Sequence, residues 1–414
     1  MYRFPNKLVQ STKIVENLSD FFSPEFINQL ARETKFVQRT SSKITGEMFL
    51  KLQLFGSLDT APSLREQLSF LKEHYDVDLS KQSLDERYNT YAVVFMKACF
   101  NNMLSKSLNL PLSCHNDLQS KFEGIYIEDS TAFQLPKELA HFYAGGGGNT
   151  PASIKINYAY ELLSGQSKHL QIADGKCNDA RFLDKPDAPI QANYLYLRDL
   201  GYHKLDEFSK IIAADGHFIS RYKSGTNIYT KVINKENNTE TYLLVDLKQL
   251  LKSVSEQKNM SIFLGEQKIP VQLFIEKVPK QVAQEKRRKL KAKVAKNKNW
   301  TPSEERKLLC DFNLFIANRN IELTLEQIAT IYALRWQIEL IFKVWKSIFN
   351  INQQLNHTNI FRFECYLYAT LIKILLSQDI MNIFKKPLLK RGFELSELKT
   401  QSIIKQEFQA FFCA

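Results

Sequence analysis

Apolar residues recur at helical spacing through the N-terminal part of the chain. The segments FSPEFINQLARET, GEMFLKLQLFGS and SLREQLSFLKEHY each place apolar residues three or four positions apart, which is the period of an amphipathic helix. A short polar break, DVDLSK, precedes QSLDERYNTYAVVFMKACFNNMLSK, which has the same period. Residues 1–120 are therefore predicted to be helical.

The last two of these segments have the outline of a helix-turn-helix, in which two helices are joined by a short turn. The second helix would begin near Ser80 to Ser83 and present Lys81, Gln82 and Arg87 in its first turns. Such side chains suit contacts with phosphates and base edges. A plain helical bundle with a solvated polar face explains the same pattern, so both interpretations stay open here.

The pattern changes to strands after residue 120. GIYIEDSTAFQLP alternates, SIKINYAYELLSGQSKHLQIADG predicts a hairpin, and ANYLYLRDLGY predicts an apolar strand. AGGGGNTPAS reads as a flexible link, and HKLDEFSKIIAADG predicts a helix that ends at glycine, before the strand HFISRYK. This order of elements predicts an α/β layer with an antiparallel portion.

Residues 226–275 are rich in predicted strands, and the chain is helical again from 326 to its end. The apolar stretch 365–383 contains Lys373 and Asp379, which favours a buried helix over a membrane span. A run of eight basic residues occupies 281–298: Lys286, Arg287, Arg288, Lys289, Lys291, Lys293, Lys296 and Lys298.

The net charge of the chain indicates a class of binding partner. The chain of 414 residues has 56 Lys and Arg against 44 Asp and Glu, a net charge of +12. Its 44% hydrophobic and 24% charged residues are ordinary for globular domains and argue against a mainly disordered chain. A basic excess of this size favours a partner made of phosphates. The basic run at 281–298 either contacts the phosphate backbone of a nucleic acid or is a solvated helix with no such contact.

Four polar side chains share one stripe if residues 332–346 form a single helix. Relative to Tyr332, the residues Arg335, Glu339 and Lys346 fall at about 300°, 340° and 320°, so all four lie within about 60°. A carboxylate between two cations suits a site for a metal and an anionic backbone. An ion-paired surface helix is the alternative, since Arg335 and Glu339 are spaced i,i+4.

Two further carboxylates are expected at the ends of strands. Asp129 follows the first predicted strand of the α/β layer, and Asp199 follows the central one. Three carboxylates that converge at one sheet edge make a hard-oxygen site suited to Mg²⁺ or Mn²⁺. Two such ions ~4 Å apart can activate an attacking oxygen and stabilise a leaving oxygen on phosphorus.

The sequence resembles the DDE transposases of bacterial insertion sequences, specifically the insertion sequence 4 family. That family is marked by Tyr-x2-Arg-x3-Glu-x6-Lys, which is present here as Tyr332, Arg335, Glu339 and Lys346. IEDST at 127–131 and RDLGY at 198–202 look like its two aspartate motifs, and FISRYK resembles the following strand. The resemblance covers about residues 20–385.

The resemblance implies an α/β fold with a ribonuclease H-like catalytic core, interrupted by a β-rich insertion, and helical N- and C-terminal regions. The implied divisions are a helical DNA-binding domain at 1–120, the first part of the core at 121–225, the insertion with its basic segment at 226–320, the last part of the core with the catalytic helix at 321–385, and a helical tail at 386–414.

The resemblance also implies roles for individual residues. Asp129, Asp199 and Glu339 would bind two Mg²⁺, with Mn²⁺ as a substitute. Phosphates at the transposon end would be held by Tyr332, Arg335, Lys346 and, as a weaker candidate, Arg221. Trp336 would either stack near an extruded base or pack in the core.

The implied activity is cut-and-paste transposition in the cytoplasm of a bacterium, in association with the nucleoid. The partners would be double-stranded DNA, as terminal inverted repeats and target, and a second copy of the chain in a synaptic complex, with no membrane. A nuclease of the same core that no longer transposes and an inactive DNA-binding repressor are the alternatives.

Overall fold

A computed structural model of the chain describes residues 23–39, 43–56, 62–106, 118, 120–147, 149–184, 189–233, 239–296, 301–354, 357–389, 391–393 and 395–413. The chain divides into two compact units. The first unit comprises residues 1–117, 130–177 and 337–414, and the second comprises residues 118–129 and 178–336.

The N-terminal part of the first unit is helical, as predicted. Its described helices are α2 (Pro24–Glu33), α3 (Gly46–Phe55), α4 (Leu64–Tyr75), α5 (Lys81–Asp85) and α6 (Thr90–Lys106). The start of α4 is fixed by a capping box: the Ser63 hydroxyl accepts from the Glu66 amide, and the Glu66 carboxylate accepts from the Ser63 amide at 2.6 Å.

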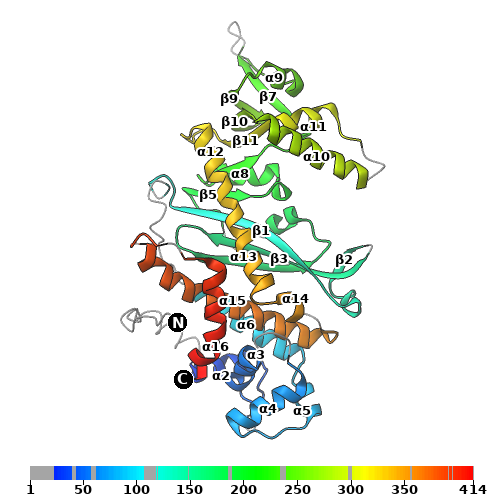
Figure 1. The fold of residues 1–414 in the computed structure, drawn as a ribbon, viewed down its shortest axis with the longest axis vertical. Coiled ribbons are helices and arrows are strands. Elements are labelled where there is room, and N and C mark those ends of the chain that lie inside the picture. Colours follow the sequence, from blue (N-terminus) through cyan, green and yellow to red (C-terminus); the bar gives the residue numbers. More distant parts are fainter. Residues whose placement is uncertain are drawn as a thin grey trace. The chain divides into compact units, whose positions relative to one another are not determined.

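The long helix α15 (Ile360–Leu389) packs against α3 and α6 within this unit (Figure 1). Its Tyr366 hydroxyl accepts a hydrogen bond from Gln67 of α4 at 2.6 Å, and both residues are buried. The predicted burial of 365–383 is therefore confirmed. In the described part of the chain, no helix is long and apolar enough to cross a membrane.

The predicted second helix of the helix-turn-helix is wrong in extent. Helix α5 is only five residues long, and a new helix, α6, follows it. The physical reason is Asn89, whose side-chain oxygen accepts from the amides of Tyr91 and Ala92 and so caps a separate helix. Asp85 at the end of α5 forms an ion pair with Arg362 of α15.

The predicted hairpin is confirmed as β3 (Thr150–Glu161) and β4 (Gln166–Asp174), which pair antiparallel. The flexible link expected at 144–153 is wrong, because β2 (Ala144–Gly147) pairs with β3. A Cβ on Gly145 would lie 1.9 Å from the Thr150 carbonyl oxygen, so glycine is needed there for a close strand contact rather than for mobility. Gly148 lies outside the described residues.

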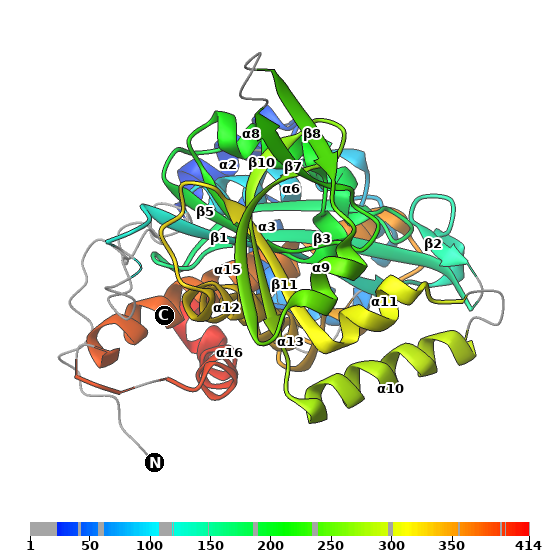
Figure 2. The same ribbon diagram turned by 90° about the horizontal axis from the view of Figure 1, so that it is seen from above.

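The second unit is built on one sheet in the order β1-β5-β6-β11-β10-β9-β7-β8. Its strands β7 and β8 lie side by side (Figure 2). Strand β1 (Gly124–Gln134) begins in this unit and pairs parallel with β5 (Tyr194–Arg198), which pairs parallel with β6 (His217–Arg221). Helix α8 (Leu205–Ala213) connects β5 to β6. The predicted mixed α/β arrangement, with antiparallel and parallel strands and helices at both ends of the chain, is confirmed.

The rest of this sheet is antiparallel. Its strands are β7 (Ile228–Ile233), β8 (Glu240–Leu244), β9 (Gln257–Leu264), β10 (Ile269–Lys277) and β11 (Phe312–Asn318). Strand β11 pairs with β6 on one side and β10 on the other. The described helices of this part are α9 (Leu247–Ser253), α10 (Lys280–Lys296), α11 (Glu304–Leu308) and α12 (Leu325–Ala333).

Candidate active site

Two aspartates come from neighbouring parallel strands of the second unit. Glu128 of β1 is the register partner of Arg198 of β5, and Asp129 and Asp199 are the next residues along each strand. Asp199 directly follows β5, as predicted. The expectation that Asp129 ends its strand is wrong, because β1 continues to Gln134. The Asp-Ser-Thr sequence is compatible with a turn, but here it lies in a continuous, partly buried strand.

The Arg335 guanidinium lies between these two carboxylates. Its Nη1 is 3.3 Å from Asp129 Oδ2, and its Nη2 is 3.8 Å from Asp199 Oδ1. The Arg335 side chain is 7% exposed, and that of Asp129 is 18% exposed, whereas Asp199 is 49% exposed. The structure therefore brings three of the predicted site residues together: Asp129, Asp199 and Arg335. The single guanidinium charge offsets part of the charge of the two carboxylates.

The expectation that residues 332–346 form one continuous helix is wrong. Helix α12 ends at Ala333, a 3-10 turn covers Leu334–Trp336, and α13 runs from Gln337 to Ser347. The 3-10 turn has three residues per turn instead of 3.6. The single narrow stripe of four polar side chains is therefore not maintained across the break, which instead places Arg335 in a turn of its own.

Tyr332 is buried beneath Arg335 in the second unit. Its hydroxyl donates to the Arg198 carbonyl oxygen at 3.3 Å, and its ring packs edge-on against Phe315 of β11. The Arg221 guanidinium, at the exposed end of β6, lies 5.8 Å from the centre of the Tyr332 ring. Burial raises the pKa of the Tyr332 phenol, so the phenol stays neutral. These contacts tie α12 to β5 and β11.

Trp336 is 59% exposed, so the core role left open for it is excluded. The Arg335 guanidinium lies 5.3 Å from the centre of its ring. An exposed indole beside a guanidinium presents a face on which a base can stack.

Glu339 and Lys346 belong to the first unit. Both lie on α13, whose Trp345 packs edge-on against Tyr158 of β3 at 5.1 Å between ring centres. Glu339 is half-buried in the first turn of this helix. Lys346 is exposed, and its ammonium lies 5.5 Å from the centre of the Phe133 ring. Among the described residues, no three His, Cys, Asp or Glu side chains gather closely enough to hold a metal ion.

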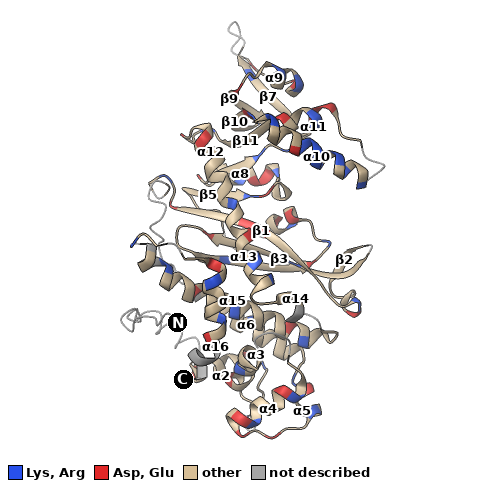
Figure 3. Cartoon of the chain, in the orientation of Figure 1, with Lys and Arg blue, Asp and Glu red and all other residues tan. Residues whose placement is uncertain are grey.

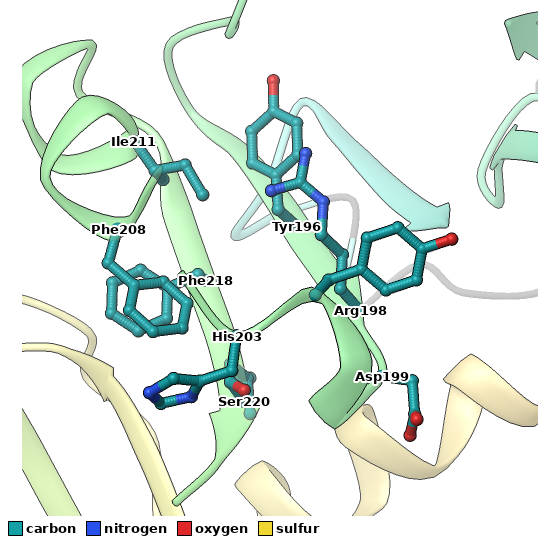
Figure 4. Close-up of a pocket in the computed structure, with 10 residues that line it drawn as sticks. Tyr196, Arg198, Asp199, His203, Phe208, Ile211, Phe218 and Ser220 are labelled. Carbon is teal, nitrogen blue, oxygen red and sulfur yellow. The ribbon is translucent and has the colours of Figure 1, made fainter. Parts of the chain in front are cut away.

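A small pocket lies beside Asp199 in the second unit (Figure 4). It is lined by side chains of β5, β6 and α8 and of the segment between β5 and α8, which includes His203. Burial lowers the pKa of His203 to about 4, so the imidazole is neutral near pH 7. The sequence pattern gives no signal for this buried histidine.

The basic run forms helix α10, on which Lys and Arg recur along the length (Figure 3). One part of it is anchored: Lys286 Nζ donates to the Phe312 carbonyl oxygen at 2.8 Å, and Arg287 pairs with Asp311 at 2.6 Å. Lys291 is exposed. Lys298 lies outside the described residues. The helix thus has an inner side held to β11 and an outer basic side.

The predicted base-contacting residues of the N-terminal region lie on and after α5. Lys81 and Gln82 are exposed, and Arg87 is half-buried. The Gln82 amide donates to Glu86 at 3.1 Å. Their role in DNA binding stays a prediction.

Residues 120–376 match the sequence profile of the family "Transposase DDE domain". The chain is 34% identical over 413 residues to the transposase for insertion sequence element IS1151 of Clostridium perfringens, covering 95% of this chain and 86% of that protein. It is 33% identical to the transposase for IS231F of Bacillus thuringiensis subsp. israelensis, covering 94% and 84%.

A fold in which two aspartates end up on adjacent strands, together with these matches, defines a nucleic-acid enzyme of the DDE class. The chain belongs to the DDE transposase family, and it is a DNA transposase, an enzyme that cleaves and transfers DNA strands. Enzymes with this domain depend on divalent metal ions.

One solved structure is also similar at low level. The cryo-EM structure of a piggyBac transposase synaptic complex with hairpin DNA gives a TM-score of 0.48 at 10% identity, covering 96% of this chain and 80% of that one.

Proposed function

We propose that this enzyme is a cut-and-paste transposase of the insertion sequence 4 group, with a ribonuclease H-like core. The proposal is supported by the gap-free Tyr332, Arg335, Glu339 and Lys346 spacing. It is also supported by the parallel order β1-β5-β6 in the second unit, which puts the two aspartates side by side. The divisions of the chain into a DNA-binding domain, core, insertion and tail remain part of the proposal.

The acids of the reaction would be Asp129, Asp199 and Glu339. The observation that carries this assignment is the single Arg335 guanidinium that both aspartates face, at 3.3 and 3.8 Å. A pair of carboxylate oxygens converging on one cation is a donor set that also fits Mg²⁺ or Mn²⁺. Glu339 follows Arg335 by four residues and is proposed as the third acid from the sequence pattern.

The proposed reaction is phosphoryl transfer without a protein nucleophile. Two Mg²⁺ ions, when bound, would lower the barrier by stabilising the attacking and leaving oxygens. Asp129, Asp199 and Glu339 would hold the ions, and the neighbouring cations of this chain would hold the reacting phosphate. The attacking group would be water in the first step and, later, the 3′-hydroxyl that the first cleavage releases. That hydroxyl would attack the opposite strand or, later, a target phosphodiester.

DNA would be held by the cations and aromatic side chains around the acids. Arg335, Arg221 and Lys346 are proposed to contact phosphates, with Trp336 as a stacking surface. Tyr332 would contribute to phosphate binding by positioning the Arg335 guanidinium. The exposed side of α10 would add backbone contacts, which contribute a salt-dependent term to affinity. The substrate would be the terminal inverted repeats and the target duplex.

Two wider consequences belong to the same proposal. The enzyme would act as a homodimer that pairs two transposon ends, and it would work in the bacterial cytoplasm in association with the nucleoid. Neither is needed for the assignment of the acids.

The test is a cleavage assay with DNA that carries the inverted repeats flanking the gene. We expect cutting at the repeat tip only when Mg²⁺ or Mn²⁺ is added. Glu339→Gln should abolish this cutting and leave binding of the ends largely intact, because it removes a metal ligand and no phosphate contact. Glu326→Gln, on the exposed side of α12, is the matched control and should cut normally.

Cutting that survives Glu339→Gln would refute the third acid. Specific binding with no cutting by the wild-type protein would favour a DNA-binding repressor. Cutting without joining to target DNA would favour a nuclease of the same core.

A further inference from the structure

A buried cluster of charge lies directly behind the two aspartates. We name Glu128, Arg198 and Glu207 the buried charge cluster; all three belong to the second unit. Arg198 Nε is 2.6 Å from Glu128 Oε2, and Arg198 Nη1 is 3.1 Å from Glu207 Oε1. Their side chains are 14%, 5% and 7% exposed for Arg198, Glu128 and Glu207. This ion pairing takes place in the interior, away from solvent.

Glu128 and Arg198 of the cluster directly precede Asp129 and Asp199 in the chain, on β1 and β5. Successive side chains of a strand point to opposite faces. Glu128 and Arg198 are register partners on one face, so Asp129 and Asp199 emerge next to each other on the other. Figure 4 shows the Arg198 side chain directed toward Tyr196, while Asp199 points elsewhere. The position of each aspartate is therefore set by the residue before it.

Stability alone does not explain such a cluster. Burial by itself lowers the pKa of Arg198, but Glu128 and Glu207 outweigh it and raise the net pKa, so the guanidinium stays charged. Well-packed apolar residues in place of a buried ion pair are often neutral or stabilising. A buried ion pair does, however, specify geometry: a slip of β1 by one residue would point Glu128 at the other face and leave Arg198 with a missing partner.

The Arg198 guanidinium is held from three sides. Glu128 binds it from β1, and Glu207 binds it from α8. The centre of the Tyr196 ring, on the same strand as Arg198, lies 5.3 Å from the central carbon of the guanidinium. A guanidinium can satisfy two carboxylates through its planar fork, whereas a lysine ammonium is a point charge on a flexible stem. Arginine is therefore required here for its shape as well as its charge.

We propose that Arg198 is a positioning residue for the reaction: through Glu128 and Glu207 it fixes the register of β1 against β5, and thereby the separation of the Asp129 and Asp199 carboxylates that receive the metal. This proposal rests on the proposed role of those two aspartates. In this proposal, neither Arg198 nor Glu128 contacts the metal or the DNA.

The experiment measures Mn²⁺ binding to the full-length protein without DNA, by the electron paramagnetic resonance signal of the free ion. Loss of a residue that orients metal ligands weakens metal affinity by roughly 10- to 100-fold in other sites. We expect a weakening of this order in Arg198→Lys, which keeps the charge and loses the fork. Glu207→Gln, which removes one arm of the cluster, should weaken binding by a smaller factor.

A second readout separates positioning from a general loss of structure. In the cleavage assay, Arg198→Lys should need more Mn²⁺ for half-maximal rate and regain much of the wild-type kcat at saturating Mn²⁺. A protein that is merely loosened would lose kcat at every metal concentration. Arg319→Lys is the matched control: Arg319 is exposed after β11 and stacks on Phe263 at 4.3 Å, so its metal affinity should equal the wild type.

Asp129→Asn, measured in parallel, distinguishes the two proposals. Wild-type Mn²⁺ affinity in Asp129→Asn would overturn the assignment of the acids. Loss of binding in Asp129→Asn together with wild-type affinity in a folded Arg198→Lys would overturn the positioning role alone. If Arg198→Lys does not fold, Glu207→Gln decides: unchanged Mn²⁺ affinity there overturns the proposal.

Discussion

Replacement of Arg335 by glutamine is expected to have opposite effects on the metal-free and the metal-bound protein. Without metal, the variant leaves Asp129 and Asp199 facing each other with the cation gone. With metal, the variant no longer has a guanidinium that competes for the same carboxylate oxygens. The wild-type protein must lose its contacts at 3.3 and 3.8 Å to bind an ion between the acids, and the variant does not.

The size of the first effect follows from burial. Removal of one partner from a buried ion pair costs ~3–5 kcal/mol. Asp199 is 49% exposed, so water screens its share, and we expect a loss of about 2 kcal/mol. For a domain of 150–250 residues this lowers Tm by about 4–8 °C.

The assay is thermal unfolding of wild type and Arg335→Gln, each in EDTA and in excess MnCl₂. We expect the variant to unfold at lower temperature in EDTA and to gain more from Mn²⁺ than the wild type gains, because an ion that binds only the native state stabilises it by mass action. The reasoning is refuted if the variant matches the wild-type Tm in EDTA, or if Mn²⁺ raises both by the same amount. Arg319→Gln, an exposed arginine of the same unit, should change neither value appreciably.

Two further predictions concern DNA. Trp336→Ala should leave Tm nearly unchanged, because the indole is 59% exposed, and should weaken binding of frayed or unpaired transposon ends by ~1–3 kcal/mol, the usual contribution of one stacked base; equal affinity in a fluorescence titration would exclude stacking. Lys291→Gln on the outer side of α10 should lower the slope of log Kd against log[KCl] by about one. Lys231→Gln, which removes an exposed cross-strand ion pair with Glu240 on β7 and β8, should leave that slope unchanged.

Local patterns predicted the elements whose form depends on nearby residues. The β3–β4 hairpin follows from alternation on both sides of Ser-Gly-Gln, and the turn places Gly165 at φ +74°, where glycine has no steric cost. The position of Asp199 was also correct, because an apolar five-residue strand followed by Asp-Leu-Gly has a clear end.

Elements that depend on distant partners were missed or misplaced. Nothing in the sequence around Arg335 marks the 3-10 turn, since the apolar period on both sides is helical. Strand β11 was not singled out, although NLFIAN is an apolar run; its place between β6 and β10 is a matter of tertiary pairing. The partnership of Glu128 with Arg198 becomes visible only when β1 and β5 are paired.

The packing of early helices on a much later helix in the first unit has a consequence for synthesis. Gln67 bonds to Tyr366, and α3 and α6 pack on α15, so the N-terminal helices complete the burial of their apolar faces against residues that are made much later. On the ribosome, they must wait while nearly 300 further residues emerge: the sequence separation of this hydrogen bond is 299. An N-terminal fragment released by premature termination would expose that apolar surface and be an aggregation and protease substrate rather than an independent DNA-binding protein.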